Sequence, residues 1–346
     1  MRKISKKGAI KVLGMDLAKQ SFQLHGVDES GQTVLRKRLA RDKLVAFIAQ
    51  LPPCLIGLEA CAGAHHWARV FKQFGHTVKM MAPQFVKPYV KSNKHDAADA
   101  EAICEAVQRP NMRFVPEKSI EQQDVQSLHR IRSQLVARRT AQGNQIRGLL
   151  SEYGIIAPKG INHLRKRLPL ILEDASNGLS DLFREMLNEL YEEMAHLDTR
   201  VEALEKKLKR LSEQNEDCRL LLTIPGIGLL SATALAAAIG DIGAFNNGRE
   251  LAAWLGLVPR QHSTGEKATL QGISKRGDSY LRMLLIHGGR AVVRVAKKYQ
   301  DRRNRWVNEL DQRRGRNITA VAVANKNARI AWAVLSKRTA YQAAAA

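Results

Sequence analysis

The chain is poor in cysteine and aromatic residues and has no long apolar run. Its four cysteines contain no Cys-x-x-Cys pair and show no regular spacing, which argues against a zinc site or a disulfide framework. We therefore expect reduced thiols and a cytoplasmic location. No apolar stretch approaches the roughly 18 residues that a membrane span needs. Lys11 and Asp16 interrupt the apolar segment that a signal peptide would require.

Acidic residues are also scarce relative to basic ones. The 346 residues include 56 Lys and Arg but only 33 Asp and Glu, which gives a formal net charge of +23. Self-repulsion of this size opposes folding, so such an excess usually serves a phosphate polymer, whose counterions are released on binding. A membrane surface is the competing partner, but aromatic residues make up only 5% of the chain and no basic amphipathic helix with an aromatic face is evident.

The hydrophobic content of 45% is high enough for folded cores, and the length predicts two or three domains. Residues 9–112 have the pattern of an α/β domain. Three apolar segments resemble consecutive strands, and a helix–strand–helix–strand pattern follows them. This order is typical of an RNase H-like sheet. The expected strands are Val12–Asp16, Phe22–Val27, Val34–Leu39, Cys54–Leu58 and Thr77–Met81, with helices at Asp42–Gln50 and Ala64–Phe74.

Residues 119–216 are expected to form a helical spacer. A long basic helix is predicted from Ile120 to Leu150, and a second helical run carries a seam of apolar residues. The seam consists of Leu197, Val201, Leu204, Leu208 and Leu211, whose spacings alternate between four and three residues. This heptad-like pattern fits either an intramolecular helical hairpin or a coiled coil that joins two copies, and the sequence favours neither.

Residues 217–338 are expected to form a mainly helical third domain. The segment Pro225-Gly226-Ile227-Gly228 lies between two apolar helical segments, as in a helix-hairpin-helix. Glycines at such a turn let backbone N–H groups face a phosphate at a helix N-terminus. Gly226 and Gly228 are therefore predicted to contact nucleic acid, although an ordinary Gly-containing helical corner gives a similar pattern.

Four carboxylates are the candidate metal ligands. Asp16 and Glu59 each end an apolar strand-like run, and Asp96 and Asp99 lie three residues apart on one face of a predicted helix. Converging carboxylates repel one another unless cations lie between them, and hard oxygen ligands suit Mg²⁺ or Mn²⁺. The pattern predicts a metal-dependent enzyme that acts on nucleic acid.

A polar, Gly-containing loop is predicted between Gly256 and Lys267, and it contains Ser263. A lone serine in a loop usually serves the turn itself, because a nucleophile needs a positioned activator. Basic residues near this loop are candidate phosphate contacts, although each is also compatible with an ordinary solvated face. They are Arg260, Lys275, Arg276, Arg282 and Arg290.

Several of these motifs together resemble a known family. Gly14-Met15-Asp16, Gly57-Leu58-Glu59 and the segment from Lys94 to Ile103 resemble the DEDD quartet of insertion sequence family 110 transposases. The segments Pro225–Gly228, Gly256–Arg260 and His262–Gly265 resemble the C-terminal domain of that family. The motifs occur in the family's order between about Lys11 and Lys337, and subgroup 1111 is the most similar.

The resemblance implies a RuvC-type RNase H-like domain, a helical spacer and a C-terminal transposase domain with a serine nucleophile. It implies Mg²⁺ held by Asp16, Glu59, Asp96 and Asp99, and a covalent phosphoserine link at Ser263. It also implies a non-coding bridge RNA that pairs with donor and target DNA. The acids and the serine are expected to come from different protomers of a dimer or tetramer.

The sequence departs from the family pattern at two positions: His95 replaces an expected Asn, and Glu266 replaces an expected Gly. Thr264 is a second hydroxyl beside Gly265, so the nucleophile is Ser263 or Thr264. Ser263 is favoured because its unbranched side chain rotates more freely at χ1.

Three functions are compatible with these observations. The first is a Mg²⁺-dependent, RNA-guided DNA recombinase that uses Ser263. The second is a junction-type endonuclease in which the acids activate water, and the third is a basic architectural protein without catalytic activity.

Overall fold

The computed structural model describes residues 8–91, 96–264 and 267–343, without the side chains of Asp96, Lys267 and Ala268. The chain forms two compact units, residues 1–119 and residues 120–346. Within the described residues, no helix is long and apolar enough to cross a membrane.

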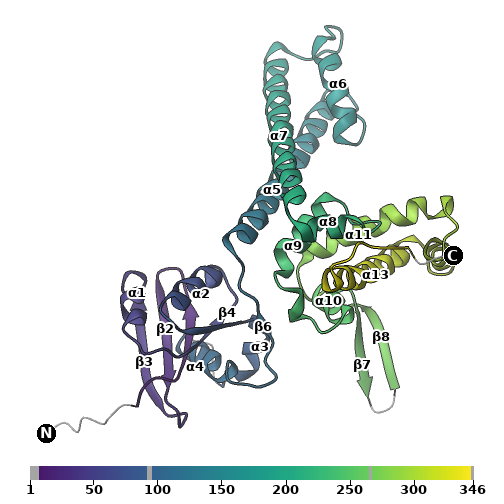
Figure 1. Ribbon diagram of the computed structural model, residues 1–346. Helices are drawn as coiled ribbons and strands as arrows, with labels where there is room; N and C mark the ends of the chain where they lie inside the picture. The colour runs from purple at the N-terminus through teal and green to yellow at the C-terminus, as the bar shows by residue number, and fades with distance from the viewer. Residues whose placement is uncertain (1–7, 92–95, 265–266, 344–346) are drawn as a thin grey trace. The chain divides into compact units, whose positions relative to one another are not determined.

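The first unit is built on a six-stranded sheet with the order β3-β2-β1-β4-β5-β6 (Figure 1). The strands are β1 (Val12–Leu17), β2 (Ser21–Val27), β3 (Thr33–Ala40), β4 (Leu55–Glu59), β5 (Thr77–Met81) and β6 (Phe114–Val115). Strands β1, β2 and β3 form an antiparallel meander, β4 and β5 run parallel to β1, and β6 is antiparallel to β5. The five predicted strands are confirmed to within about a residue, and the short β6 was not predicted.

Helices cover both faces of this sheet. Helices α1 (Arg41–Ala49) and α2 (Ala64–Gln73) pack on one face, where Leu13, Met15, Ile56 and Leu58 point into the core. Helices α3 (Pro83–Val86) and α4 (Asp96–Ala106) pack on the other face. Because side chains alternate along a strand, Gly14 and Gly57 lie on the α4 face.

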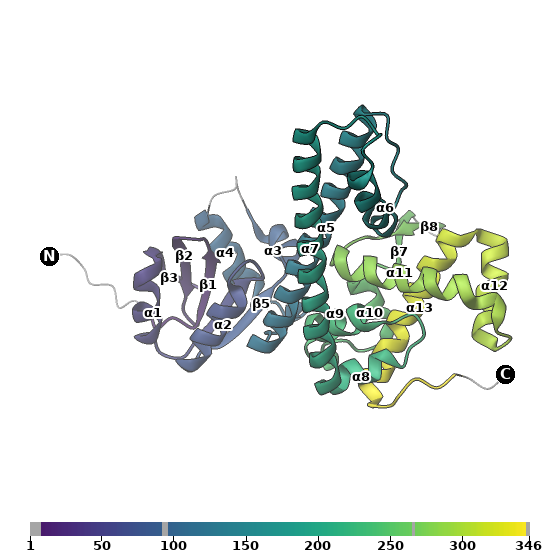
Figure 2. The same cartoon turned by 90° about the horizontal axis from the view of Figure 1, so that it is seen from above.

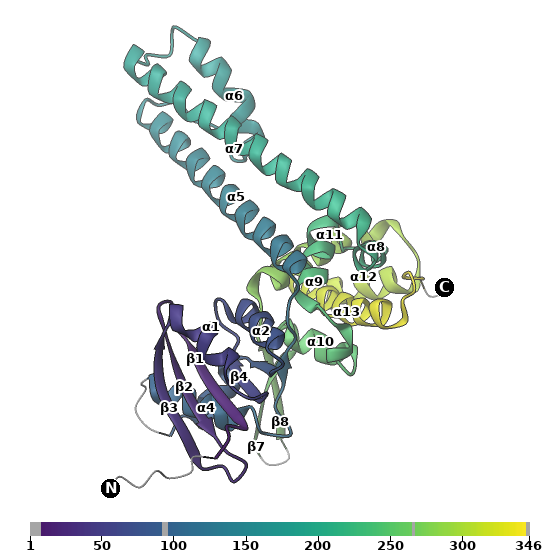
Figure 3. The same ribbon diagram turned by 60° about the vertical axis from the view of Figure 1, so that its left-hand side comes forward.

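The second unit contains a long antiparallel helical hairpin. Helices α5 (Ile120–Glu152) and α7 (Asp181–Gln214) lie side by side, and α6 (Ile161–Glu173) packs against their far ends (Figures 2 and 3). Leu135 of α5 packs against Leu197 and Val201 of the predicted seam, Leu208 is fully buried, and Leu211 is 37% exposed. The seam therefore serves a hairpin within one chain, which was one of the two interpretations.

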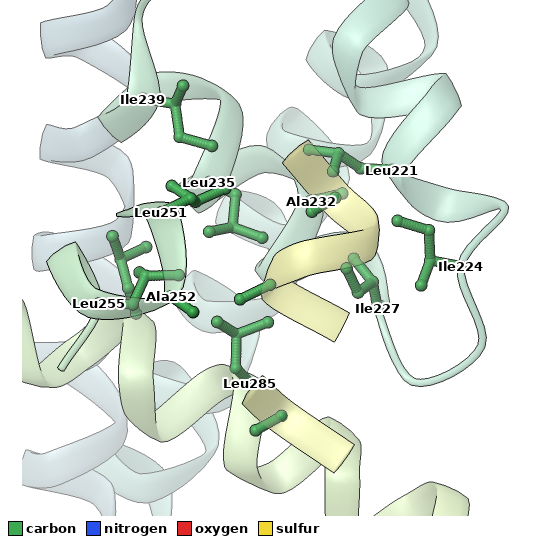
Figure 4. Close-up of a cluster of buried hydrophobic side chains, with 14 of the residues drawn as sticks. Leu221, Ile224, Ile227, Ala232, Leu235, Ile239, Leu251, Ala252, Leu255 and Leu285 are labelled. Atoms are coloured by element: carbon green, nitrogen blue, oxygen red, sulfur yellow. The ribbon is translucent and has the colours of Figure 1, made fainter. Parts of the chain in front are cut away.

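The rest of the second unit is a helical bundle. Its members are α8 (Glu216–Leu222), α9 (Leu229–Ile239), α10 (Gly248–Trp254), α11 (Ser279–Val295), α12 (Arg302–Arg314) and α13 (Arg316–Lys337). Leu221, Leu235, Leu251 and Leu285 come from four of these helices and meet in one buried cluster (Figure 4).

The prediction of a polar loop at residues 256–267 is wrong, because much of this segment forms strands. Strands β7 (Pro259–Thr264) and β8 (Lys267–Ile273) form an antiparallel hairpin that projects from the bundle (Figure 1). All six residues of β7 are exposed, so the strand has no buried face and its sequence lacks the alternation of apolar and polar residues that marks a strand.

A buried histidine fastens the helical hairpin to the bundle. His129 of α5 lies 2.9 Å from the Tyr280 hydroxyl through Nδ1 and 2.9 Å from the Thr233 hydroxyl through Nε2. Thr233 donates its only hydroxyl hydrogen to the carbonyl of Leu229, at 2.8 Å. Thr233 must therefore accept from Nε2–H, and Nδ1 accepts from Tyr280. Burial, with a smaller effect from Arg132, lowers the pKa of His129 to about 4.

This buried histidine should make the second unit less stable in mild acid. Because the pKa of His129 is about 4 in the folded state and 6.5 as a model value, the unfolded state takes up the proton first as pH falls. The free energy of unfolding should therefore fall between pH 6.5 and pH 4, by up to about 3 kcal/mol from this group. Urea denaturation at a series of pH values measures this dependence.

His129→Gln should remove this part of the pH dependence, whatever its effect on stability at neutral pH. His196→Gln is the matched control, since His196 is an exposed histidine of the same helical hairpin. Equal pH slopes for His129→Gln and the unsubstituted chain would contradict the assignment.

Candidate active site

Asp16 and Glu59 lie at the carboxyl ends of two neighbouring parallel strands. Strand β1 pairs with β4 up to Met15 opposite Leu58, so the two acids are the next residues of that register. Met15 and Leu58 point into the α1–α2 core, and the two acids therefore point to the α4 face. Both residues are half-buried. The structure thus brings together two acids that are 43 positions apart in the sequence.

Two glycines let helix α4 pack directly on these strands. A Cβ on Gly14 would lie 2.2 Å from the Ala100 carbonyl oxygen, and one on Gly57 would lie 3.2 Å from Cγ2 of Ile103. Further along α4, Cys104 donates from Sγ to the carbonyl of Val12, at 3.8 Å. Since Ala100 lies opposite Gly14 and Cys104 reaches back to Val12, α4 runs antiparallel to β1. Its N-terminal turn is therefore directed toward the end of β1 that carries Asp16.

That N-terminal turn contains the other two predicted acids. Asp96 is the first residue of α4, one turn before Ala100, and Asp99 is half-buried next to Ala100. The side chain of Asp96 lies outside the described residues, as does His95. For Asp96, therefore, only the backbone position is known, and it lies in the turn directed toward the carboxyl end of β1.

Cys61 lies beside the strand-end acids and was not singled out by the sequence. Its N–H donates to the carbonyl of Glu59 at 2.8 Å, and its Sγ lies 4.0 Å from the carbonyl oxygen of Leu17. Burial raises the pKa of the Cys61 thiol, and the charges of Glu59 and then Asp16 raise it further. The charges of Glu59 and Asp16 both act on the Cys61 thiol, so the two carboxylates lie close to the same side chain.

The donor chemistry of this neighbourhood suits a hard cation. Carboxylate oxygens are the ligands that Mg²⁺ and Mn²⁺ prefer. Within the part of the chain that the structure describes, no three His, Cys, Asp or Glu side chains are grouped closely enough to hold a metal ion. Asp16 and Glu59 are therefore of the right ligand type for such a metal. A complete ligand set would also need the acids of α4.

Other nearby acids point elsewhere. Glu101 pairs with Arg36 of β3 at 3.3 Å and lies 4.0 Å from the Lys91 ammonium, and Glu105 pairs with Arg109, just beyond the end of α4. His65 of α2 accepts from the backbone N–H of Lys118 at 3.2 Å. Burial and the nearby Lys118 lower its pKa to about 4, as expected for a structural histidine.

Ser263 lies near the tip of the β7–β8 hairpin and is exposed. Its Oγ accepts a hydrogen bond from Nε2 of Gln261, at 2.7 Å. Gln261 and Ser263 are two residues apart and share one face of the strand, while Thr264 points to the other face. The choice between the two hydroxyls is therefore a choice of strand face. Gly265 and Glu266 lie outside the described residues.

The predicted helix-hairpin-helix segment joins α8 to α9, and its two glycines differ in surroundings. Gly226 has φ +90° and packs against α11 and α13, where an added Cβ would lie 2.7 Å from Val292. The neighbouring Pro225 carbonyl accepts from Arg303 at 3.0 Å and from Asn327 at 3.1 Å. Gly228 is exposed and precedes α9, with no atom within 4 Å of an added Cβ. Gly226 thus serves internal packing, and Gly228 is the more accessible candidate contact.

The predicted phosphate contacts also differ from one another. The side chain of Arg282 donates to the carbonyls of Leu255 and Gly277, at 3.3 and 3.5 Å, which occupies part of its guanidinium. The remaining four are exposed and stay candidates: Arg260, Lys275, Arg276 and Arg290.

Comparisons with known proteins identify the family. Residues 13–155 match a family model described as a transposase, and residues 218–304 match one described as the transposase IS116/IS110/IS902 family. A probable family 20 transposase of Pseudomonas aeruginosa is 53% identical over 95% of this chain and 98% of its own length. This chain belongs to the IS116/IS110/IS902 family of transposases.

Two transposases of named insertion sequences are also similar along nearly the whole chain. The transposase of IS1111A from Coxiella burnetii is 47% identical over 97% of this chain and 92% of its own length. The transposase of IS1328 from Yersinia enterocolitica is 44% identical over 96% of this chain and 98% of its own length. The chain is thus an insertion-sequence transposase, an enzyme that acts on DNA.

The close contact between α4 and the sheet gives a first test of the site in this transposase. Gly14→Ala should push α4 away from β1, because the new Cβ would meet backbone atoms rather than a flexible side chain. We expect the free energy of unfolding to fall by roughly 1–3 kcal/mol. DNA cleavage should fall further than this loss of folded protein explains, since the turn that carries Asp99 moves with the helix. Urea denaturation and a cleavage assay at matched folded concentration measure both effects.

Gly148→Ala is the matched control, because Gly148 is exposed in α5 and has no atom within 4 Å of an added Cβ. That change should stabilise the helix by roughly 0.5–1 kcal/mol and leave cleavage unaltered. Normal stability and normal cleavage in Gly14→Ala would show that the close approach is not needed.

Proposed function

We propose that this transposase cuts and rejoins DNA with a divalent metal held by Asp16, Glu59, Asp96 and Asp99, and with Ser263 as the nucleophile. The observation that carries the proposal is the pairing of Asp16 and Glu59 at the ends of adjacent parallel strands, toward which the first turn of α4 is directed. The strand order β3-β2-β1-β4-β5, with its antiparallel meander followed by parallel strands, supports an RNase H-like domain of the RuvC type.

Asp16 and Glu59, with the acids of α4, would hold Mg²⁺ or Mn²⁺. When bound, the metal polarises the scissile phosphate and favours loss of the proton from the attacking hydroxyl. The protein supplies the placement of the ligands: two rigid strand ends and one helix held close by Gly14 and Gly57. Ligands on such elements keep their geometry better than ligands on loops.

Ser263 would attack the phosphorus atom of a DNA strand. A new Oγ–P bond forms, the bond from phosphorus to one deoxyribose oxygen breaks, and that oxygen leaves as a hydroxyl after taking up a proton. The proton lost by Ser263 passes to solvent or a nearby base. A hydroxyl from another DNA end then reverses the step, so strands are exchanged without net hydrolysis. The exposure of Ser263 on a projecting hairpin supports this role, because a bulky phosphodiester can reach it.

The alternative is an endonuclease in which the same acids activate water and the C-terminal bundle only binds DNA. Ser263→Ala separates the two mechanisms. We expect loss of both covalent protein–DNA adducts and strand transfer, because no other group would store the phosphodiester bond. Labelled DNA that stays attached to denatured protein on a gel measures the adduct. Unchanged cleavage by Ser263→Ala would favour activated water.

Thr264→Ala is the matched control for Ser263→Ala, since Thr264 lies on the opposite strand face, and it should retain adduct formation. Asp16→Asn should abolish cleavage in both mechanisms while DNA binding persists. Cleavage at the normal rate by Asp16→Asn would contradict the metal site.

The acids and Ser263 belong to different compact units, at residues 1–119 and 120–346. We propose that the two halves of one active site come from different protomers of a dimer or tetramer. A mixture of Asp16→Asn and Ser263→Ala protomers should then recover part of the activity that each variant lacks alone.

We also propose that a non-coding bridge RNA guides this transposase, as the family resemblance implies, and that exposed Gly228 contacts nucleic-acid phosphate at the start of α9. In such a mechanism base pairing carries the target sequence, and the protein binds shape and backbone. The net charge of +23 supports binding of nucleic acid in general but does not distinguish RNA from DNA.

Purification tests the guide. A discrete RNA species should remain bound at 1 M salt, where charge attraction alone is strongly screened. Sequencing of the retained RNA should give one structured transcript that is encoded beside the gene. A heterogeneous mixture that washes off at high salt would contradict a dedicated guide.

A further inference from the structure

A basic hollow lies on the α4 face of the sheet, over strands β2 and β3. Its volume is about 390 Å³. Among the described residues that line it are Arg36, Arg38 and Lys91, while Glu101 is the one lining carboxylate. The side chains of Arg36 and Lys91 are 67% and 73% exposed. The hollow therefore presents accessible positive charge.

The strand register connects this hollow to the proposed metal site. Asp16 of β1 lies opposite Gln23 of β2, and Gln23 lies opposite Arg38 of β3. With Glu59 beside Asp16, these residues form one row across the sheet, all on the face that α4 covers. Two strand spacings separate Asp16 from Arg38, or about 10 Å between backbones. The row thus has negative side chains at Glu59 and Asp16 and a positive side chain at Arg38. A short piece of nucleic-acid backbone can span the distance between them.

We infer that the hollow binds the phosphate backbone of the DNA strand that leads into the acid site, with Arg36, Arg38 and Lys91 as phosphate contacts. This inference rests on the proposed function, because it gives the hollow the same substrate as the acids. Arginine presents a planar set of donors that matches phosphate oxygens, and exposed charges can make that contact without first leaving a protein core.

The hollow is suited to backbone rather than to bases. Its described lining residues include two aromatic rings: that of Tyr89, with the guanidinium of Arg109 already 5.8 Å from the ring centre, and that of His25, which is buried. Base-specific contacts need groove-reading pairs or free stacking surfaces. The contact should therefore be independent of DNA sequence.

Glu101 occupies the place of a phosphate in the absence of DNA. Its carboxylate lies 3.3 Å from the Arg36 guanidinium and 4.0 Å from the Lys91 ammonium. It also lies 3.9 Å from Nδ1 of the buried His25, whose pKa is lowered mainly by burial. A bound phosphate would compete with Glu101 for the same two cations, so Glu101 weakens binding while it keeps the cations in position.

The test uses the full chain with duplex DNA in EDTA, so that no reaction occurs. Lysine acetylation followed by mass spectrometry reports on individual ammonium groups. Lys91 should be protected by DNA. Lys37 is the matched lysine: it also borders the hollow, but its ammonium lies on the opposite sheet face, 4.6 Å from the centre of the Phe47 ring of α1. It should be labelled equally with and without DNA.

The double variant Arg36→Ala/Arg38→Ala should lose the protection of Lys91. The slope of log affinity against log salt should also become shallower by about 2, since two phosphate contacts are removed. Lys37→Ala should leave the slope unchanged. Glu101→Gln should instead strengthen DNA binding, because it removes the carboxylate that competes with phosphate for Arg36 and Lys91.

Equal labelling of Lys91 with and without DNA would overturn the inference, as would an unchanged salt slope in the double variant. Protection of Lys91 by RNA but not by DNA would also overturn it. None of these readouts depends on cleavage, so they can fail while Asp16→Asn still abolishes cleavage. Conversely, Lys91 can be protected even if the acids prove not to be catalytic.

Discussion

The arrangement of the first unit depends on how closely helix α4 approaches the sheet. Gly14 and Gly57 have no side chains, so the backbone of α4 lies directly against β1 at Gly14, and the side chains of Ile103 and Val107 pack on β4 at Gly57. A close-packed interior does not absorb even one added methyl group without movement. The contact directs the first turn of α4 toward the ends of the strands that carry Asp16 and Glu59. Residues without functional groups thus determine where the acidic groups lie.

The elements that the sequence predicted well are those whose burial produces a regular pattern. The five strands Val12–Met81 lie in or beside a core, and their apolar runs marked them to within about a residue. The two glycines were visible as Gly-x-Asp and Gly-x-Glu, two residues before each acid, but only the structure shows which helix they accommodate. The heptad-like seam was equally visible, and its partner was not, because α5 and a second copy of α7 would offer similar apolar surfaces.

The candidate site was harder to predict where it depends on exposure. The β7–β8 hairpin has no buried face, so its residues resemble a loop. Cys61, Arg36 and Arg38 gave no motif at all, since their significance comes from cross-strand register rather than from spacing along the chain. Gly226 was expected to face phosphate and instead packs against α11 and α13, because a Pro-Gly turn serves a tight helical corner as readily as a ligand.

The hairpin that carries Ser263 has a consequence for how such chains can diverge. Consecutive residues of β7 face opposite sides, and the strand already contains one irregularity between Pro259 and Gln261. Inserting or deleting a single residue before Ser263 would exchange the orientations of its hydroxyl and that of Thr264. Changes of chain length in this strand should therefore be tolerated in pairs, because only an even change keeps the Ser263 hydroxyl on its present face.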